Sequence, residues 1–155
     1  MRLLYGHDAD VAKFISDQIP HVREHGFGDC RAIGVIDQTG LLVGGMAFHH
    51  WWPEAGTIEF SGAATTPKWL TRKILDRMFG YAFSIPGIQM LVTRNSASNT
   101  RLHRQLNAYG FDRFDIPRLF GRDDDGVIWT LTKEAFLASR FHEPVSARCV
   151  DEQCR

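Results

Sequence analysis

The segment 57–93 places a strand, a helix and a second strand in one short stretch, and this order restricts the fold more than any other feature. "TIEFSGAA" (57–64) has the composition of a strand, and "IQMLVT" (88–93) is continuously apolar, as in a strand buried on both faces. Between them an apolar stripe has helical spacing. Two strands joined by a helix within one sheet are parallel with a right-handed crossover. The stripe consists of Leu75, Met78, Phe79 and Ala82.

The flanking sequence predicts further elements and an α+β fold. A helix is expected within 8–22, and two strands at 31–37 and 41–48 form an antiparallel meander with 57–64. Gly44 and Gly45 inside the second strand indicate a bulge or a close backbone approach. The sheet is therefore predicted to be mixed and mostly antiparallel, with about six strands and helices flanking it. The remaining elements are a helix at 99–109, a hairpin at 111–132 and a helical turn at 133–139.

Length and charge exclude several classes of protein. The 155 residues indicate one domain, predicted at 1–140 with a flexible tail at 141–155. Lys plus Arg equal Asp plus Glu at 18 each, so no global field attracts nucleic acid, and a nucleic-acid partner is not expected. No apolar run approaches the ~20 residues of a membrane helix. The polar start does not resemble a signal peptide, which predicts a cytoplasmic protein.

The cysteines and histidines predict neither a disulfide framework nor a metal centre. Cys30, Cys149 and Cys154 are odd in number, and two of them lie in the polar tail. A redox or metal pair in the tail is the alternative to two exposed thiols. His49 and His50 are adjacent, but the other five histidines are scattered without ligand spacing. The expectation is that no metal is bound.

Four local features resemble the GCN5-related N-acetyltransferases, the acyl-CoA-dependent GNAT family. They are the strand 57–64 running into a Pro-x-Trp turn and helix, the "YAF" that closes this helix, Asn99 followed eleven residues later by Gly110-Phe111, and the hairpin after it. The resemblance covers about residues 3–137. It implies an acyl-CoA-dependent N-acyltransferase that moves acetyl from acetyl-CoA to a primary amine, without a metal.

The sequence departs from this family in the loop that holds the coenzyme phosphates. The family loop is Arg/Gln-x-x-Gly-x-Gly/Ala, whereas neither 68–73 nor 70–75 contains a glycine. A helix start leaves backbone N–H groups that bind phosphate without special side chains. Leu70, Thr71, Arg72 and Lys73 are therefore the candidate phosphate site. The alternative is that Thr66 with Pro67, or Thr71, caps a helix whose cations face solvent.

Other residues are expected to hold the rest of the coenzyme. The small Gly62, Ala63 and Ala64 leave room for its pantetheine arm beside the strand. The resemblance implies that Asn99 hydrogen-bonds this arm, although Asn99 also fits a helix cap. Arg104, with Arg101 three residues before it, is a candidate phosphate ligand.

Acyl transfer requires an uncharged amine, and a general base supplies it. Glu59 is the acidic residue of the strand 57–64, and the resemblance implies a base glutamate there; an exposed strand carboxylate is the alternative. His49 is a second candidate. His49 and His50 should point to opposite faces of their strand, so that one faces the cleft. Leu106 stands where the family often has an acid tyrosine, which leaves Tyr109, one turn on, as the candidate acid.

Two functions remain open on the sequence. The first is the N-acetyltransferase, with a small-molecule or peptide amine as partner. The second is a protein of the same fold that binds the coenzyme weakly or not at all and acts by interaction. The resemblance allows a homodimer.

Overall fold

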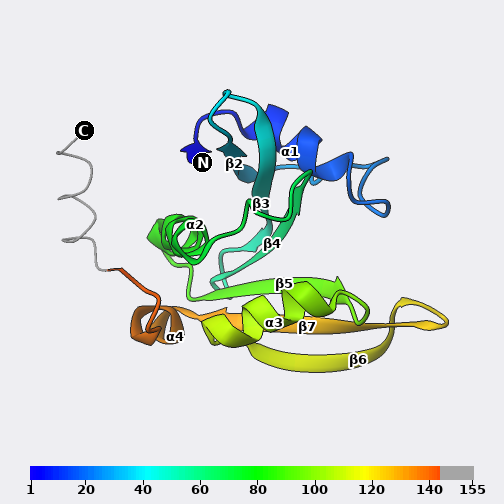
Figure 1. Ribbon diagram of the computed structural model, residues 1–155. Coiled ribbons are helices and arrows are strands. Elements are labelled where there is room, and N and C mark those ends of the chain that lie inside the picture. Colours follow the sequence, from blue (N-terminus) through cyan, green and yellow to red (C-terminus); the bar gives the residue numbers. More distant parts are fainter. Residues whose placement is uncertain (144–155) are drawn as a thin grey trace.

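The chain, described here as a computed structural model over residues 1–143, forms one seven-stranded sheet with four helices (Figure 1). The sheet order is β1-β2-β3-β4-β5-β7-β6. This confirms the predicted α+β class. The strands are β1 (Arg2–Leu4), β2 (Arg31–Ile36), β3 (Leu42–Trp52), β4 (Thr57–Ala64), β5 (Met90–Ser96), β6 (Asp112–Gly121) and β7 (Asp124–Thr132), and the helices are α1 (Asp8–Ser16), α2 (Arg72–Ser84), α3 (Thr100–Tyr109) and α4 (Lys133–Ala138).

The predicted crossover is present, and its two strands separate after three residue pairs. β4 and β5 are parallel, with pairs from Thr57↔Met90 to Glu59↔Val92. Beyond Glu59, β4 continues beside β3 alone as far as Ala64, while β5 stays beside β7. Figure 1 shows the consequence, since β3 and β4 diverge from the β5–β7–β6 part of the sheet. The fold therefore opens a gap beside the second half of β4.

The two faces of β2–β4 are covered by different helices. On one face, Val11 and Ile15 of α1 cluster with Ala32 and Ala47. On the other, the apolar stripe of α2 joins the larger core that contains Phe60. The close approach predicted for the strand glycines occurs here, because a methyl group on Gly45 would lie 2.9 Å from Val11.

The main differences from the predicted elements lie near the N-terminus. β1 is three residues long and was not predicted, because so short an edge strand has no periodicity to detect. The helix predicted within 8–22 ends at Ser16, and turns follow it. The predicted hairpin at 111–132 and the helix start at Asn99 are confirmed, and Gly110 ends α3 at φ 110°.

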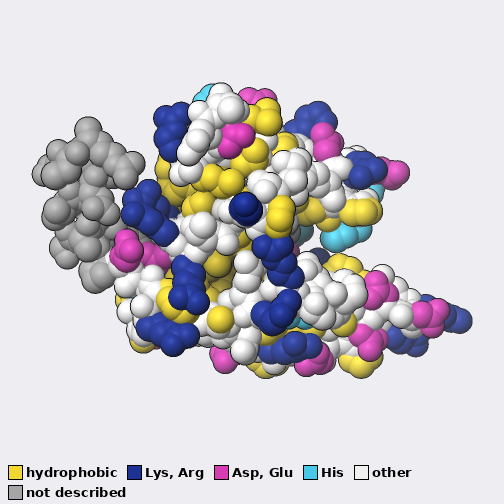
Figure 2. Space-filling model, in the orientation of Figure 1, with side chains coloured by type: hydrophobic (Ala, Val, Ile, Leu, Met, Phe, Trp, Pro, Cys, Tyr) yellow, Lys and Arg dark blue, Asp and Glu magenta, His cyan; other side chains and the backbone are white. Residues whose placement is uncertain are grey.

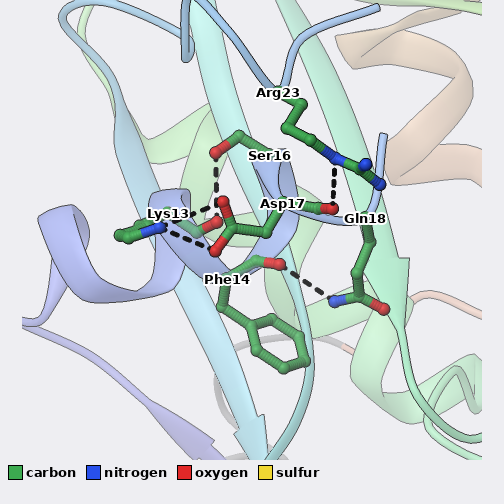
Figure 3. Close-up of polar contacts among 6 residues, drawn as sticks. All are labelled: Lys13, Phe14, Ser16, Asp17, Gln18 and Arg23. Carbon is green, nitrogen blue, oxygen red and sulfur yellow. Dashed lines mark hydrogen bonds and ion pairs between the residues drawn. The ribbon is translucent and has the colours of Figure 1, made fainter. Parts of the chain in front are cut away.

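Side-chain contacts hold the turns that follow α1 against its last turn (Figure 3). Lys13 Nζ lies 2.7 Å from Asp17 Oδ2, and Gln18 Nε2 donates to the carbonyl of Phe14 at 2.9 Å. Arg23 Nε donates to the carbonyl of Asp17 at 3.0 Å. These contacts fix a segment that has no regular structure of its own.

The end of the described chain packs on α2. His142 Nδ1 lies 2.9 Å from Asp76 Oδ1, and the Glu143 N–H donates to Asp76 Oδ2 at 3.2 Å. The rest of the predicted tail, with Cys149 and Cys154, lies outside the described residues. Within residues 1–143, no helix is long and apolar enough to cross a membrane.

Candidate active site

A cavity of about 340 Å³ lies where β4 has left β5, between the end of β4 and the start of α3. We call it the β4–α3 cavity. Five of the residues predicted to hold the coenzyme line it, from three separate parts of the chain: Gly62, Ala63, Ala64, Leu70 and Asn99. Asn99 also caps α3, since its side chain accepts from the Leu102 N–H at 3.4 Å. The capping and cavity-lining positions of Asn99 therefore coexist.

The wall formed by β4 presents backbone polar groups as well as small side chains. The Thr65 N–H donates to the carbonyl of Val43 in β3 at 2.9 Å. Residues of an antiparallel strand alternate in the direction of their backbone groups. The N–H and C=O groups of Gly62 and Ala64 therefore point away from β3, toward the edge that β5 has left. A ligand lying along this edge can bond to β4 as another strand would.

Trp69, in the β4–α2 loop, covers the two strand glycines nearest this cavity. A methyl group on Gly44 would lie 2.7 Å from the indole ring, and one on Gly62 would lie 3.2 Å from it. Arg101 of α3 donates to the carbonyl of Pro67 at 2.6 Å and so ties the loop to α3. The sequence places Trp69 in the turn, and only the folded chain shows that its ring forms part of the cavity.

The start of α2 lines a neighbouring cavity of about 380 Å³, the α2–α3 cavity. Thr71 is the N-cap of α2, and its hydroxyl accepts from the Ile74 N–H at 3.2 Å, which confirms the capping interpretation. Arg72 and Arg104 also line this cavity, and Leu70 lines both cavities. Lys73 is among the lining residues of neither. The phosphate role of this helix start remains a prediction.

Cations gather on this side of the molecule. Figure 2 shows Lys and Arg side chains over the region between α2 and α3, whereas acidic side chains are more frequent along the β6–β7 hairpin. The Arg72 guanidinium lies 4.3 Å from the ring centroid of Phe141. The neutral chain thus carries a local positive patch beside the two cavities.

A third cavity, of about 450 Å³, lies on the other side of Glu59 and is lined by four of the seven histidines. We call it the histidine cavity. Its walls come from β3, β4, β5, the turns after α1 and the β6–β7 hairpin. Figure 2 shows a hollow between the part of the molecule that carries α1 and this hairpin. The four histidines are His21, His25, His49 and His50.

The prediction that His49 and His50 face opposite sides of the strand is wrong. Both line the histidine cavity, because the β3–β4 register shifts between His49 and Trp52. His50 has a φ of 50°, in the left-handed region that residues other than glycine seldom adopt. This bulge breaks the alternation of side chains and turns both imidazoles toward Glu59.

Glu59 stands at the centre of a polar cluster. Its Oε2 lies 3.0 Å from His50 Nδ1 and 3.7 Å from His49 Nδ1. Its Oε1 lies 3.4 Å from Arg94 Nε. Glu59 is 22% exposed, so its carboxylate is partly shielded yet reachable from the cavity. The predicted base is therefore a half-buried carboxylate with three basic neighbours.

His49 is buried and uncharged. Burial lowers its pKa from 6.5 to about 4, with further lowering by His50 and Arg94. Its Nε2 lies 2.9 Å from Ser61 Oγ, and its ring stacks on Phe27 with centroids 4.9 Å apart. A neutral imidazole has one N–H and one free lone pair. With the N–H on Nε2 toward Ser61, the lone pair of Nδ1 faces His50 and Glu59.

Tyr109, the predicted acid, lies in a different environment. It is 3% exposed, and its hydroxyl donates to the buried Asp76 Oδ1 at 3.0 Å. It lines the α2–α3 cavity and not the histidine cavity that holds Glu59. The geometry gives Tyr109 a structural partner in α2.

Several residues of the histidine cavity were missed in the sequence. Arg94 follows the apolar run of β5, and Ser61 lies two residues after Glu59, hence on the same face of β4. Phe27, His21 and His25 are distant in sequence. The period of two in β4 could have identified Ser61, but no local signal links the turns after α1 to Glu59.

Comparisons with known proteins identify the fold. No family model matches the chain, and no curated protein matches its sequence. Solved structures do match. A variant of spermidine N-acetyltransferase from Vibrio cholerae has a TM-score of 0.71 at 14% identity, over 89% of this chain and 98% of that one. A chimera of that enzyme with hSSAT has a TM-score of 0.69 at 16% identity, over 88% and 99%.

A structure described as a putative acetyltransferase from Acinetobacter baylyi is similar to the same extent. Its TM-score is 0.67 at 16% identity, over 92% of this chain and 96% of that one. These three matches span nearly the whole of each known chain, so they concern the complete fold and not one motif. The chain therefore has the fold of the GCN5-related N-acetyltransferases, as its sequence predicted.

Proposed function

We propose that this chain transfers the acetyl group of acetyl-CoA to a primary amine, with Glu59 as the general base. The observation that carries the proposal is the position of Glu59 on β4. Residues 59–61 of this strand line the histidine cavity, and residues 62–64 line the β4–α3 cavity. A donor in one cavity and an acceptor in the other would meet at the point where β4 and β5 separate.

The β4–α3 cavity fits the pantetheine arm of acetyl-CoA. This arm is a narrow chain with two amides, and the free edge at Gly62 and Ala64 offers it backbone donors and acceptors. Thr71, Arg72 and Arg104 in the adjoining cavity would receive the phosphates. The α2 N-terminus adds partial positive charge there, which compensates for the missing loop glycines. Leu70, which lines both cavities, would lie between the two parts of the coenzyme.

The histidine cavity fits the acceptor. Primary amines have pKa values near ~10.4 and are mostly protonated at neutral pH. The Glu59 carboxylate accepts a proton from the ammonium group, directly or through one water. His49 is uncharged and does not repel the cation, and its bond to Ser61 fixes its ring. Phe27 and Phe120 supply apolar surface for the rest of the acceptor.

The transfer itself is one displacement. The neutral amine attacks the thioester carbonyl, the N–C bond forms and the C–S bond breaks. Glu59 passes the proton taken from the ammonium group to water before the attack, so its carboxylate is free to accept the second proton lost from nitrogen, and the sulfur leaves as a thiolate. A thiol has a pKa near ~8.5, so water in the open groove can supply the proton to sulfur. This route needs no acid from Tyr109, whose hydroxyl is bonded to Asp76.

The spermidine N-acetyltransferases among the structural matches favour a small amine as acceptor, and the dodecamer reported for the Vibrio cholerae enzyme favours self-association. On this basis we extend the proposal to a small or peptide amine as substrate and to a homo-oligomer, with a dimer as the simplest form. An acceptor panel with labelled acetyl-CoA and a sedimentation experiment test these two points.

The alternative function, interaction without catalysis, is favoured by the glycine-free loop with Trp69 over the strand. Titration with acetyl-CoA in a calorimeter separates the two. We expect binding, and Ala64→Trp should abolish it by filling the cavity, while Ala9→Trp on the exposed side of α1 serves as control. Absence of binding at millimolar acetyl-CoA would eliminate the transferase.

If the coenzyme binds, Glu59→Gln tests the base. This substitution keeps the size and polarity of the side chain and removes the proton acceptor. We expect kcat to fall about 10²–10⁴-fold with little change in acetyl-CoA affinity. Unchanged turnover in the variant would show that Glu59 is not the base.

A further inference from the structure

His49, His50 and Glu59 converge on one point of the histidine cavity, where each directs one potential metal-binding atom at the other two. The atoms are His49 Nδ1, His50 Nδ1 and Glu59 Oε2. Spacing along the chain gives no sign of a metal site. The convergence is created by a cross-strand pair, His49↔Glu59, and by the bulge at His50, and neither is visible in the sequence.

We propose that these three side chains form a binding site for a zinc-class divalent ion. Two imidazoles and one carboxylate are a ligand set found in catalytic zinc sites, which leave the fourth position open. Calcium and magnesium prefer oxygen ligands, so the two imidazoles favour a transition metal.

The distances suit such an ion. Tetrahedral zinc with bonds of about 2.0–2.1 Å has ligand atoms about 3.3–3.4 Å apart. The three separations are 2.5 Å between the two Nδ1 atoms, 3.0 Å from His50 Nδ1 to Glu59 Oε2, and 3.7 Å from His49 Nδ1 to that oxygen. They lie on either side of the tetrahedral value. Shifts below 1 Å, mainly of the exposed His50 ring, would equalise them.

Neighbouring residues already orient two of the three ligands. Ser61 holds His49 Nε2 at 2.9 Å, which leaves Nδ1 to the ion. Arg94 holds the other oxygen of Glu59 at 3.4 Å, which leaves Oε2. Such outer contacts fix tautomer and ring orientation in metal sites. Arg94 is 52% exposed, so water screens its repulsion of the ion.

The surroundings also leave an access route for the ion and an open coordination position. His49 is 7% exposed and Phe27 stacks on it, whereas His50 is 60% exposed. The ion would thus be bound by the buried imidazole of His49, which packing holds in place, and by the exposed imidazole of His50, which packing restrains less. Its fourth position would face the cavity, where water can complete the coordination.

The consequence for activity rests on the proposed function. Glu59 Oε2, the oxygen nearest the two imidazoles, would be shared with the ion and no longer accept a proton from the amine. Bound zinc and a bound amine would therefore exclude each other, and zinc would inhibit the transfer reaction.

The test is zinc binding to the full chain, measured by calorimetry and by competition with a chromogenic chelator, without acetyl-CoA. Since thiols also bind zinc, the parent is the Cys30→Ser, Cys149→Ser, Cys154→Ser variant. We expect one ion per chain. His50→Ala and Glu59→Gln should each weaken binding more than about 100-fold, and Ser61→Ala about 10-fold, as for outer-contact residues. His7→Ala, an exposed histidine outside the cavity, should change nothing.

Two results would overturn the proposal. One is no binding at about 100 μM free zinc; the other is binding that survives both His50→Ala and Glu59→Gln unchanged. Circular dichroism confirms that each variant is folded, which is expected because His50 lies at the surface. Zinc binding and acetyl-CoA binding are measured separately. Failure of the metal site therefore leaves the transferase proposal intact, and failure of coenzyme binding leaves the metal site intact.

Discussion

The buried imidazole of His49 should make the stability of the protein depend on pH in a defined window. Its pKa is lowered to about 4 in the folded chain, from 6.5, chiefly because burial disfavours the charged form. Between these two values the unfolded chain binds a proton that the folded chain does not. Above pH 6.5 His49 is neutral in both states and does not lower the free energy of unfolding. As the pH falls from 6.5 toward 4, the free energy of unfolding decreases.

The magnitude follows from the two pKa values. Each unit corresponds to about 1.4 kcal/mol, so the difference between 6.5 and about 4 gives about 3–4 kcal/mol. That is a large share of the ~5–15 kcal/mol by which a domain of this size is stable. The effect is well above the uncertainty of a denaturation measurement.

The assay is urea unfolding followed by circular dichroism at a series of pH values, with a chelator to exclude metal ions. His49→Gln removes the titrating ring and keeps a polar side chain. The free energy of unfolding of the wild type should fall more steeply from pH 6.5 to 4 than that of the variant, by about 3–4 kcal/mol in total. His7→Gln controls for loss of a surface imidazole. Parallel curves for wild type and His49→Gln would refute the assignment of a buried neutral His49.

Three further substitutions test packing and capping by urea unfolding. Gly44→Ala places a methyl group 2.7 Å from the Trp69 ring, so it should cost about 1–3 kcal/mol and weaken coenzyme binding; an unchanged midpoint would mean that Trp69 moves freely. Thr71→Ala removes the cap of α2 and should cost about 1 kcal/mol, with Thr71→Ser as the variant expected to restore it. Asp76→Ala removes the buried carboxylate that accepts from the Tyr109 hydroxyl, His142 and the Glu143 N–H, and should cost about 2–3 kcal/mol, whereas no loss would imply that water replaces it.

The sequence determined the elements other than the short edge strand β1, and their order, because these depend on local signals. Hydrophobic periodicity located the strand at 57–64 and the helix after it. Short-range capping chemistry gave Thr66 or Thr71 as the start of α2 and Gly110 as the end of α3, and the structure has Thr71 and Gly110. The parallel pairing of β4 and β5 followed from a general rule for strands joined through a helix. Glu59 and Asn99 were singled out by the family pattern that this order made visible.

The tertiary structure alone decided how the candidate site is assembled. The gap beside Gly62 exists because β4 and β5 separate after Glu59, and no local sequence feature marks where two strands part. His50 joins His49 at Glu59 only because a bulge reverses the alternation that the sequence predicts. His21 and Arg94 come to the same cavity from turns and strands far apart in the chain, through packing that depends on the whole fold. Hydrophobic periodicity and helix capping depend on neighbouring residues and can be read from the sequence, whereas the convergence of distant side chains depends on the folded sheet.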